Sequence, residues 1–164
     1  NIFRKRFGFE GWKNFDNALW EKIRDISLEK EKEYYGVISG ADNFQKSLRA
    51  CRSNINNALM RDDIKIKMED FFDSTAVQGS HVVFNPPYGE RLRIGINKFY
   101  QKIGDTLKHN YKGCTVWLIS SDIENLKMIG LKPSRKIKIF NGKLECRFVR
   151  YDIYEGSKKA SKQI

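Results

Sequence analysis

Apolar residues recur along the chain at helical spacing, then at strand spacing, then at helical spacing again. The first helical stripe ends at the charged run 29–33 and predicts a helix. Its members are Phe15, Leu19, Trp20, Ile23 and Ile26. A short apolar run over 35–38 predicts a strand, and residues 39–42 predict the tight turn that closes it. The second helical stripe carries basic residues on its outer face and consists of Phe44, Leu48, Cys51, Ile55, Ala58 and Leu59.

The middle of the chain predicts three further strands and one helix. Residues 64–68 alternate between apolar and charged side chains, as a half-buried strand does. The short run 81–84 stops before Pro86, because proline cannot continue a central strand. Residues 96–107 have helical spacing, and the unbroken apolar run 114–119 is typical of a buried parallel strand.

The last part of the chain changes rhythm. Ser121 and Glu124 have the spacing of a capping box, which predicts a short helix through Ile129. The dipeptide 141–142, Asn-Gly, lies between two alternating runs and predicts a β-hairpin. Residues 155–164 are basic and lack an apolar pattern, so we expect a disordered tail.

Strands that alternate with helices and end in a hairpin predict an α/β fold. Its sheet is expected to be mostly parallel, with one reversed strand near an edge. A chain of 164 residues fits one domain, here residues 1–154. Ligands of such sheets bind at the carboxyl ends of the strands. The polar residues predicted at those ends are Asp42, Asp70, Asn85 and Ser120.

The charge balance of the chain is strongly basic. It has 31 Lys and Arg against 20 Asp and Glu, a formal net charge of +11. This excess suits a polyanion such as RNA, because neutralising phosphates releases counterions. Basic residues cluster over 132–150, where Lys136 and Lys138 are predicted to contact RNA phosphates. A solvated hairpin face is the alternative interpretation of this cluster.

Several kinds of site and location are not expected. No apolar run approaches the roughly 20 residues of a membrane span, and the N-terminus lacks the core of a signal peptide. The 3 cysteines lie in apolar-patterned segments, which predicts buried thiols and a cytoplasmic location. His81 and His109 lie far apart and away from other ligand residues, so no metal site is predicted.

The stretch Asn85-Pro86-Pro87-Tyr88 directly follows a predicted strand and contains two of the 3 prolines. Adjacent prolines hold the backbone in a fixed extended conformation. The Asn85 side-chain oxygen and the Pro86 carbonyl can accept both N–H bonds of an exocyclic base amine, which exposes the nitrogen lone pair. Tyr88 can stack on a base taken out of its helix. A rigid turn with a surface tyrosine is the alternative interpretation.

Two acidic residues at predicted strand ends also have more than one interpretation. Asp42 is either the N-cap of the helix that starts near Phe44 or an acceptor for a ribose hydroxyl. Asp70 either ends its strand in a turn or contacts a ligand.

Together these residues resemble the class I S-adenosylmethionine-dependent methyltransferases. In detail the chain resembles the bacterial 23S rRNA guanine-N2 methyltransferases that also carry a THUMP RNA-binding domain. The extended motif 85–92 carries this resemblance, supported by residues 9–20 and by the hairpin segment 141–146. The family implies a Rossmann-like catalytic domain, with its antiparallel strand supplied by the C-terminal hairpin.

The resemblance also implies roles for single residues. Asp42 would bind the ribose of S-adenosylmethionine, Asp70 would meet the adenine amino group, and Phe71 would lie beside the adenine ring. Residues 85–88 would hold the target base, with Asn85 also near the cofactor. Arg91 would contact the RNA.

The sequence departs from the family at two places. A glycine-rich loop after a first strand is absent, and Phe44 stands where a second acidic residue is usual. The chain begins at Asn1, so we expect the C-terminal part of a catalytic domain. Its first strand, glycine loop and THUMP domain would then belong to a longer parent protein, and the chain alone would bind S-adenosylmethionine poorly and be inactive.

Three functions remain open at this point. The leading one is methylation of guanine N2 in 23S rRNA. A DNA adenine-N6 methyltransferase would share residues 85–88, although the extension 89–92 favours RNA. The third is a non-catalytic, basic RNA-binding fragment, whose RNA binding would depend on salt and ignore S-adenosylmethionine.

Overall fold

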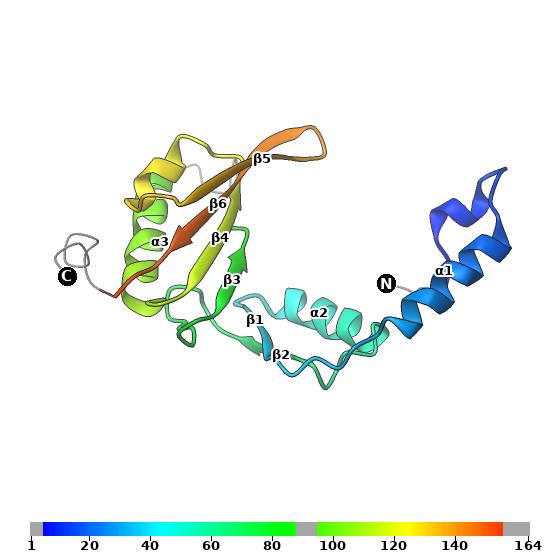
Figure 1. The fold of residues 1–164 in the computed structure, drawn as a ribbon. Helices are drawn as coiled ribbons and strands as arrows, with labels where there is room; N and C mark the ends of the chain where they lie inside the picture. The colour runs from blue at the N-terminus through cyan, green and yellow to red at the C-terminus, as the bar shows by residue number, and fades with distance from the viewer. Residues whose placement is uncertain (1–4, 88–94, 156–164) are drawn as a thin grey trace, which may run out of the picture. The chain divides into compact units, whose positions relative to one another are not determined.

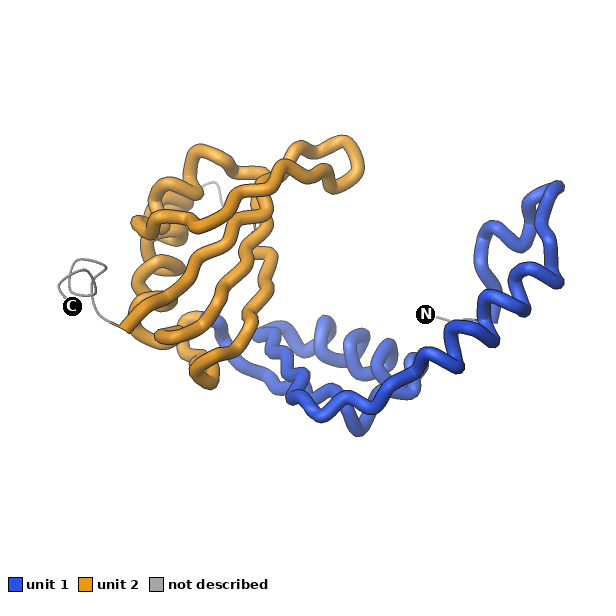
Figure 2. Tube along the Cα trace, viewed as in Figure 1, with its two compact units in different colours: residues 1–71 blue, residues 72–164 orange. Residues whose placement is uncertain are grey.

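The structure is a computed structural model that describes residues 5–87 and 95–155. The chain divides into two units, residues 1–71 and residues 72–164 (Figure 2). The described residues of unit 1 form a 3-10 helix, two α-helices and a two-stranded parallel sheet (Figure 1). These elements are η1 (Gly8–Gly11), α1 (Asn17–Glu29), β1 (Ile38–Asp42), α2 (Gln45–Asn57) and β2 (Ile64–Met68).

Helix α1 forms where its apolar stripe predicts it. The Asp16 carboxylate caps the helix by accepting a hydrogen bond from the Leu19 amide at 3.0 Å. Aromatic rings gather at this end, where the Phe9 centroid lies 5.0 Å from that of Trp20 and 6.0 Å from that of Phe15. α1 has no buried residue, so these ring contacts stabilise its first turns locally.

Strand β1 begins later than the hydrophobic pattern predicts. The expected strand over 35–38 with a turn over 39–42 is wrong, because residues 38–42 themselves form the strand. Tyr35 and Val37 are 87% and 86% exposed. The residues of β1 pair with β2 from Ile38 opposite Ile64 to Asp42 opposite Met68. Ladder hydrogen bonds come from the backbone, so a strand of small side chains forms here beside the half-buried isoleucines of β2.

The prediction that the cysteines are buried holds for two of the three. α2 buries only Leu48, and Cys51, one turn further along, is exposed. The expectation of a buried thiol is therefore wrong for Cys51. Cys114 and Cys146 are buried, as predicted.

The described residues of unit 2 form a four-stranded sheet with α3 and η3 (Figure 1). Their bounds are β3 (His81–Phe84), α3 (Ile96–Asn110), β4 (Thr115–Ser120), η3 (Asn125–Ile129), β5 (Arg135–Asn141) and β6 (Leu144–Asp152). The strand order is β3-β4-β6-β5, in which β3 and β4 are parallel and β6 is antiparallel to both neighbours. The predicted α/β fold with one reversed strand near an edge is confirmed.

Most of the core of unit 2 lies on one face of this sheet, and Cys146 is buried on the other. Val116 opposite Tyr151 and Leu118 opposite Val149 form buried cross-strand pairs between β4 and β6. α3 contributes its own buried residues, which are Tyr100, Ile103, Gly104, Thr106 and Leu107. On the other face, the Trp117 and Phe148 rings stack with centroids 4.5 Å apart.

The segment after β4 differs from its prediction. The capping box of Ser121 and Glu124 does not form, and the expected helix is the 3-10 helix η3. Asp122 takes over the capping role, because its Oδ1 accepts a hydrogen bond from the Asn125 amide at 3.1 Å. At the hairpin, Gly142 has φ 61° in the left-handed region that this turn requires, so the predicted Asn-Gly hairpin is confirmed.

Within residues 5–87 and 95–155, no helix has the length and apolar character that crossing a membrane requires. The expected tail over 155–164 falls outside the described residues except for Glu155.

Gly104 provides a test of the packing in unit 2. A Cβ at this position would overlap with the backbone carbonyl of Ile129, which cannot rotate away. Alanine is favoured over glycine in a helix by about 1 kcal/mol, but overpacking typically costs about 1–3 kcal/mol. We therefore expect Gly104→Ala to lower the urea midpoint of unfolding. Gln101→Ala on the exposed side of α3 is the control and should change it little; a more stable Gly104→Ala variant would contradict the packing.

Tyr151 predicts how stability changes at alkaline pH. Burial, together with repulsion from Tyr100, raises the pKa of Tyr151 to about 12. A pKa raised by folding means that this contribution to stability is complete below about pH 10, the ordinary tyrosine value, and is lost as pH rises towards 12. Urea unfolding between pH 9 and about 12 should show this decline. Tyr151→Phe should flatten it, and an unchanged pH profile in that variant would refute the assignment.

Candidate functional site

Asp42 and Asp70 lie at the carboxyl edge of the unit 1 sheet. Asp42 is the last residue of β1, and Asp70 follows the parallel strand β2 by two residues. Two hydrogen bonds join the segments beyond the strands. The Glu69 amide donates to the Asp42 carbonyl at 3.3 Å, and Asn43 Nδ2 donates to Asp70 Oδ2 at 2.9 Å. The structure thus brings these two predicted site residues together.

The carboxylate of Asp42 is half-buried and accepts one local hydrogen bond. Its Oδ1 accepts this bond from the Phe44 amide at 2.7 Å. The N-cap of α2 is Phe44, so the alternative interpretation of Asp42 as that N-cap is wrong. Within the described part of the chain, Oδ2 of Asp42 receives no hydrogen bond. This oxygen can accept a hydrogen bond from a ligand hydroxyl.

Asp70 and Phe71 are both half-buried at the same edge. A carboxylate accepts hydrogen bonds from amino or hydroxyl groups, and a neighbouring phenyl ring offers an apolar surface to a flat heterocycle. Asn43, which binds Asp70, is not among the predicted site residues. The signal for it is its place directly after a strand end, and this signal is hidden when residues 39–42 are interpreted as a turn.

Asn85, Pro86 and Pro87 form the exit from β3 in unit 2. β3 pairs with β4 up to Phe84 opposite Leu118, so this turn lies at the carboxyl end of two parallel strands. Pro86 is buried, which anchors the turn, whereas Asn85 and Pro87 are exposed. The Asn85 side chain is therefore accessible to a ligand. Tyr88 and Arg91 lie outside the described residues.

Ser120, the fourth polar residue predicted at a strand end, is fully buried at the end of β4. Its hydroxyl forms a hydrogen bond of 2.7 Å with the Tyr100 hydroxyl and accepts one of 3.0 Å from the Asp122 amide. These bonds connect β4 to α3 and to the segment before η3. Ser120 therefore has a structural role and does not face a ligand.

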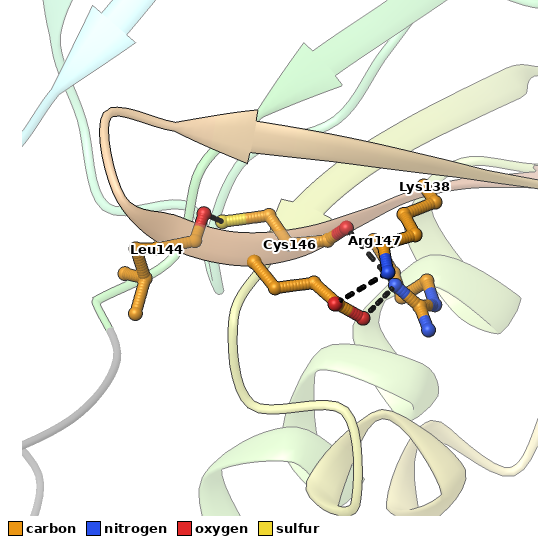
Figure 3. A network of polar contacts seen from close by, with 5 residues as sticks. Lys138, Leu144, Cys146 and Arg147 are labelled. Carbon is orange, nitrogen blue, oxygen red and sulfur yellow. Dashed lines mark hydrogen bonds and ion pairs between the residues drawn. The ribbon is translucent and has the colours of Figure 1, made fainter.

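The basic residues of the hairpin form a small ionic network (Figure 3). Glu145 lies between two cations: Lys138 Nζ is 2.6 Å from its Oε2, and Arg147 Nη1 is 2.6 Å from its Oε1. Hydrogen bonds from Lys138 and then Arg147 hold the pKa of Glu145 below its usual value, so the carboxylate is ionised at neutral pH. Lys136 is exposed on the same strand as Lys138. Both predicted lysines thus lie on one surface, but Lys138 shares its charge with Glu145.

No group of three or more histidine, cysteine or acidic residues able to hold a metal ion occurs among residues 5–87 and 95–155.

The mostly parallel strands with the reversed strand β6, together with the likeness to solved methyltransferases, show that the chain has the Rossmann-like class I methyltransferase fold. The chain belongs to the RMKL-like methyltransferase domain family, whose sequence model matches residues 2–150.

Relatives and solved structures agree with this membership. The chain is 32% identical over 163 residues to a ribosomal RNA large subunit methyltransferase K/L of Shewanella baltica (strain OS185), covering 94% of this chain and 23% of that protein. The crystal structure of SMU.472 complexed with SAH superposes with a TM-score of 0.77 at 26% identity, over 94% of this chain and 42% of that one. A possible methylase from Clostridium difficile 630 superposes with a TM-score of 0.78 at 25% identity, over 95% of this chain and 42% of that one.

Proposed function

We propose that this chain is part of an S-adenosylmethionine-dependent methyltransferase that modifies N2 of a guanine in large-subunit rRNA. The observation that carries the proposal is the exposed Asn85 beside the buried Pro86, at the carboxyl end of β3, in a chain of the RMKL-like methyltransferase domain family. The rRNA substrate is supported by the curated relative, which is a ribosomal RNA large subunit methyltransferase.

The residues at the unit 1 sheet edge fit the nucleoside part of S-adenosylmethionine. Oδ2 of Asp42, which receives no hydrogen bond from the described residues, is an acceptor for a ribose hydroxyl. Asp70 is an acceptor for the adenine amino group, and Phe71 offers its ring to adenine. Asn43 positions Asp70 through its hydrogen bond to Oδ2. SAH bound to SMU.472 supports this choice of cofactor.

Asn85 and the Pro86 carbonyl would hold the exocyclic amine. The nitrogen lone pair of such an amine is delocalised into the ring and is a weak nucleophile. Two acceptors that bind its N–H groups draw the nitrogen towards a tetrahedral shape and expose the lone pair. When bound, S-adenosylmethionine would supply an electrophilic methyl group, whose carbon–sulfur bond breaks as the carbon–nitrogen bond forms, with S-adenosylhomocysteine as the leaving group. The methylated nitrogen then loses a proton, for which Asn85 provides no base, so the proton passes to solvent.

The proposal includes a longer parent protein. This chain spans 23% of the length of the Shewanella relative, and no glycine-rich loop precedes Asp42 in its sequence. We infer that residues 1–154 are part of one catalytic domain and that the glycine-rich loop and a THUMP domain lie elsewhere in the parent. On this proposal the 164-residue chain alone binds S-adenosylmethionine poorly and is inactive. Calorimetry that gave tight binding to the chain would refute that part.

The proposal also locates the protein in the cytoplasm and away from membranes. Its three cysteines are free, and one of them is exposed. Free thiols of this kind are typical of a reducing compartment.

Asn85→Ala in the parent gene tests the proposed reaction. We expect the loss of one N2-methylguanosine from 23S rRNA, as in a deletion strain, because the amine loses an acceptor that activates it. Mass spectrometry of digested rRNA measures this. Asn54→Ala, an exposed helix position, is the matched control and should retain the modification. Unchanged rRNA together with a fall in genomic N6-methyladenine would instead favour DNA as the substrate.

Charge reversal tests the basic surface. Lys136→Glu combined with Lys138→Glu should weaken RNA binding and reduce the slope of log Kd against log salt by about 0.7 for each phosphate that the variant no longer neutralises. Fluorescence anisotropy with labelled RNA at several salt concentrations measures the slope. Lys46→Glu on the exposed face of α2 makes the same kind of charge change elsewhere and should leave the slope unaltered. A slope that stays the same in the double variant would contradict the prediction.

A further inference from the structure

The β5–β6 hairpin extends past the end of the sheet where Asn85 lies. β4 ends at Ser120, which pairs with Arg147, whereas β6 begins at Leu144 and β5 continues to Asn141. At about 3.3 Å per residue, the hairpin reaches roughly 10 Å beyond the last residue of β4. β3 is parallel to β4 and ends at the same side, so the hairpin projects from the edge that carries Asn85 (Figure 1).

Phe140 lies on the extended part of this hairpin and is 63% exposed. It is two residues beyond Lys138 on β5 and pairs with Glu145 on β6. Side chains alternate along a strand and match across a ladder. Phe140 therefore shares one face with Lys136, Lys138, Glu145 and Arg147. Lys138 Nζ lies over one face of the Phe140 ring, 5.3 Å from its centre, as a cation–π contact.

This hairpin face combines one exposed ring with three cations and a single carboxylate. A single exposed apolar side chain is common on protein surfaces and marks no site by itself, so it is the cations around this ring that point to a ligand. Aromatic rings flanked by arginine and lysine bind single-stranded nucleic acid, because the ring stacks on a base while the cations contact phosphates. Paired bases cannot stack in this way, so the surface fits an unpaired segment of RNA.

The register places the hairpin within reach of a strand that enters the Asn85 site. Lys138 pairs with Arg147, and Arg147 pairs with Ser120. β3 lies beyond β4 in the same sheet, and its pairing ends at Phe84, just before Asn85. Neighbouring strands are about 4.8 Å apart, so β5 and β3 are separated by roughly 14 Å. A few nucleotides of extended RNA span that distance.

We propose that Phe140 stacks on an unpaired base next to the target nucleotide, while Lys138 and Arg147 contact the adjacent phosphates. This inference rests on the proposed function, since it takes RNA as the substrate and Asn85 as the position of the target base. Glu145 holds the two cations in place by its ion pairs (Figure 3). Phe140 pairs with Glu145 and therefore lies on the same face of the hairpin.

The test measures binding of the 164-residue chain to a fluorescein-labelled single strand of about 12 nucleotides by anisotropy. We expect Phe140→Ala to raise the Kd by about 5- to 150-fold, the range for loss of one stacked base, with an unchanged salt slope. Phe140→Trp should restore affinity. Leu144→Ala is the matched control: Leu144 is also exposed, at 46%, on the same hairpin but faces the other way, and its loss should change the Kd less than twofold.

Several results would overturn the proposal. These are no RNA binding by the wild-type chain, an equal effect of Leu144→Ala, failure of Phe140→Trp to restore affinity, or an equal effect of Phe140→Ala on a duplex of the same sequence. Thermal unfolding of each variant checks that the fold is intact. The proposed methylation is tested separately, because the rRNA modification in the Asn85→Ala strain is measured without reference to Phe140. Loss of RNA affinity in Phe140→Ala with unchanged rRNA in Asn85→Ala would leave the hairpin contact standing and refute the methylation.

Discussion

The antiparallel pairing of β6 with β4 is the constraint on which unit 2 depends. β6 lies between β4 and β5 and runs against both, so its register fixes where the hairpin emerges and which residues face the core. Tyr151 and Val149 pair with Val116 and Leu118, and all four side chains are buried on the same face of the sheet. A shift by one residue would expose this entire set and bury the charged neighbours. The buried core and the basic hairpin are therefore consequences of one register.

In both units the candidate site residues lie at the carboxyl ends of parallel strands, but their functional groups differ. In unit 1 the edge offers carboxylates, and Asn43 holds one of them in place. In unit 2 the edge offers an exposed amide at Asn85, held by the buried Pro86. Carboxylates suit the hydroxyl and amino donors of a nucleoside, whereas an amide oxygen can accept from an amine without adding a negative charge. The two edges therefore suit different kinds of ligand group.

The sequence alone predicts an element correctly where its local pattern agrees with the tertiary structure. The stripe of α3 and the Asn-Gly turn at 141–142 are strong local signals, and both elements form as predicted. The hydrophobic pattern misplaces β1 because Tyr35 and Val37 are apolar, as strand residues often are, but are exposed in the structure. The observed strand contains Ser39 and Gly40 and forms through backbone pairing with β2. Position at a strand end selects Ser120, but only the structure reveals that Tyr100 binds its hydroxyl. The ion pair of Lys138 with Glu145 is a diagonal contact that requires the register of β5 and β6.

One face of β6 changes along the strand from buried apolar residues to partly exposed charged residues, because the apolar core covers only part of that face. Tyr151 and Val149 are apolar and buried on the face that carries the core of unit 2, whereas Arg147 and Glu145 continue the same face and are partly exposed. A strand alternates strictly, so this change cannot come from a switch of face. It follows that Glu145 and Arg147 lie beyond the apolar cover of this face, where a charged pair loses less solvation than it would in the core. The strand that closes the core can therefore also carry the basic hairpin, because a single register supplies both surfaces.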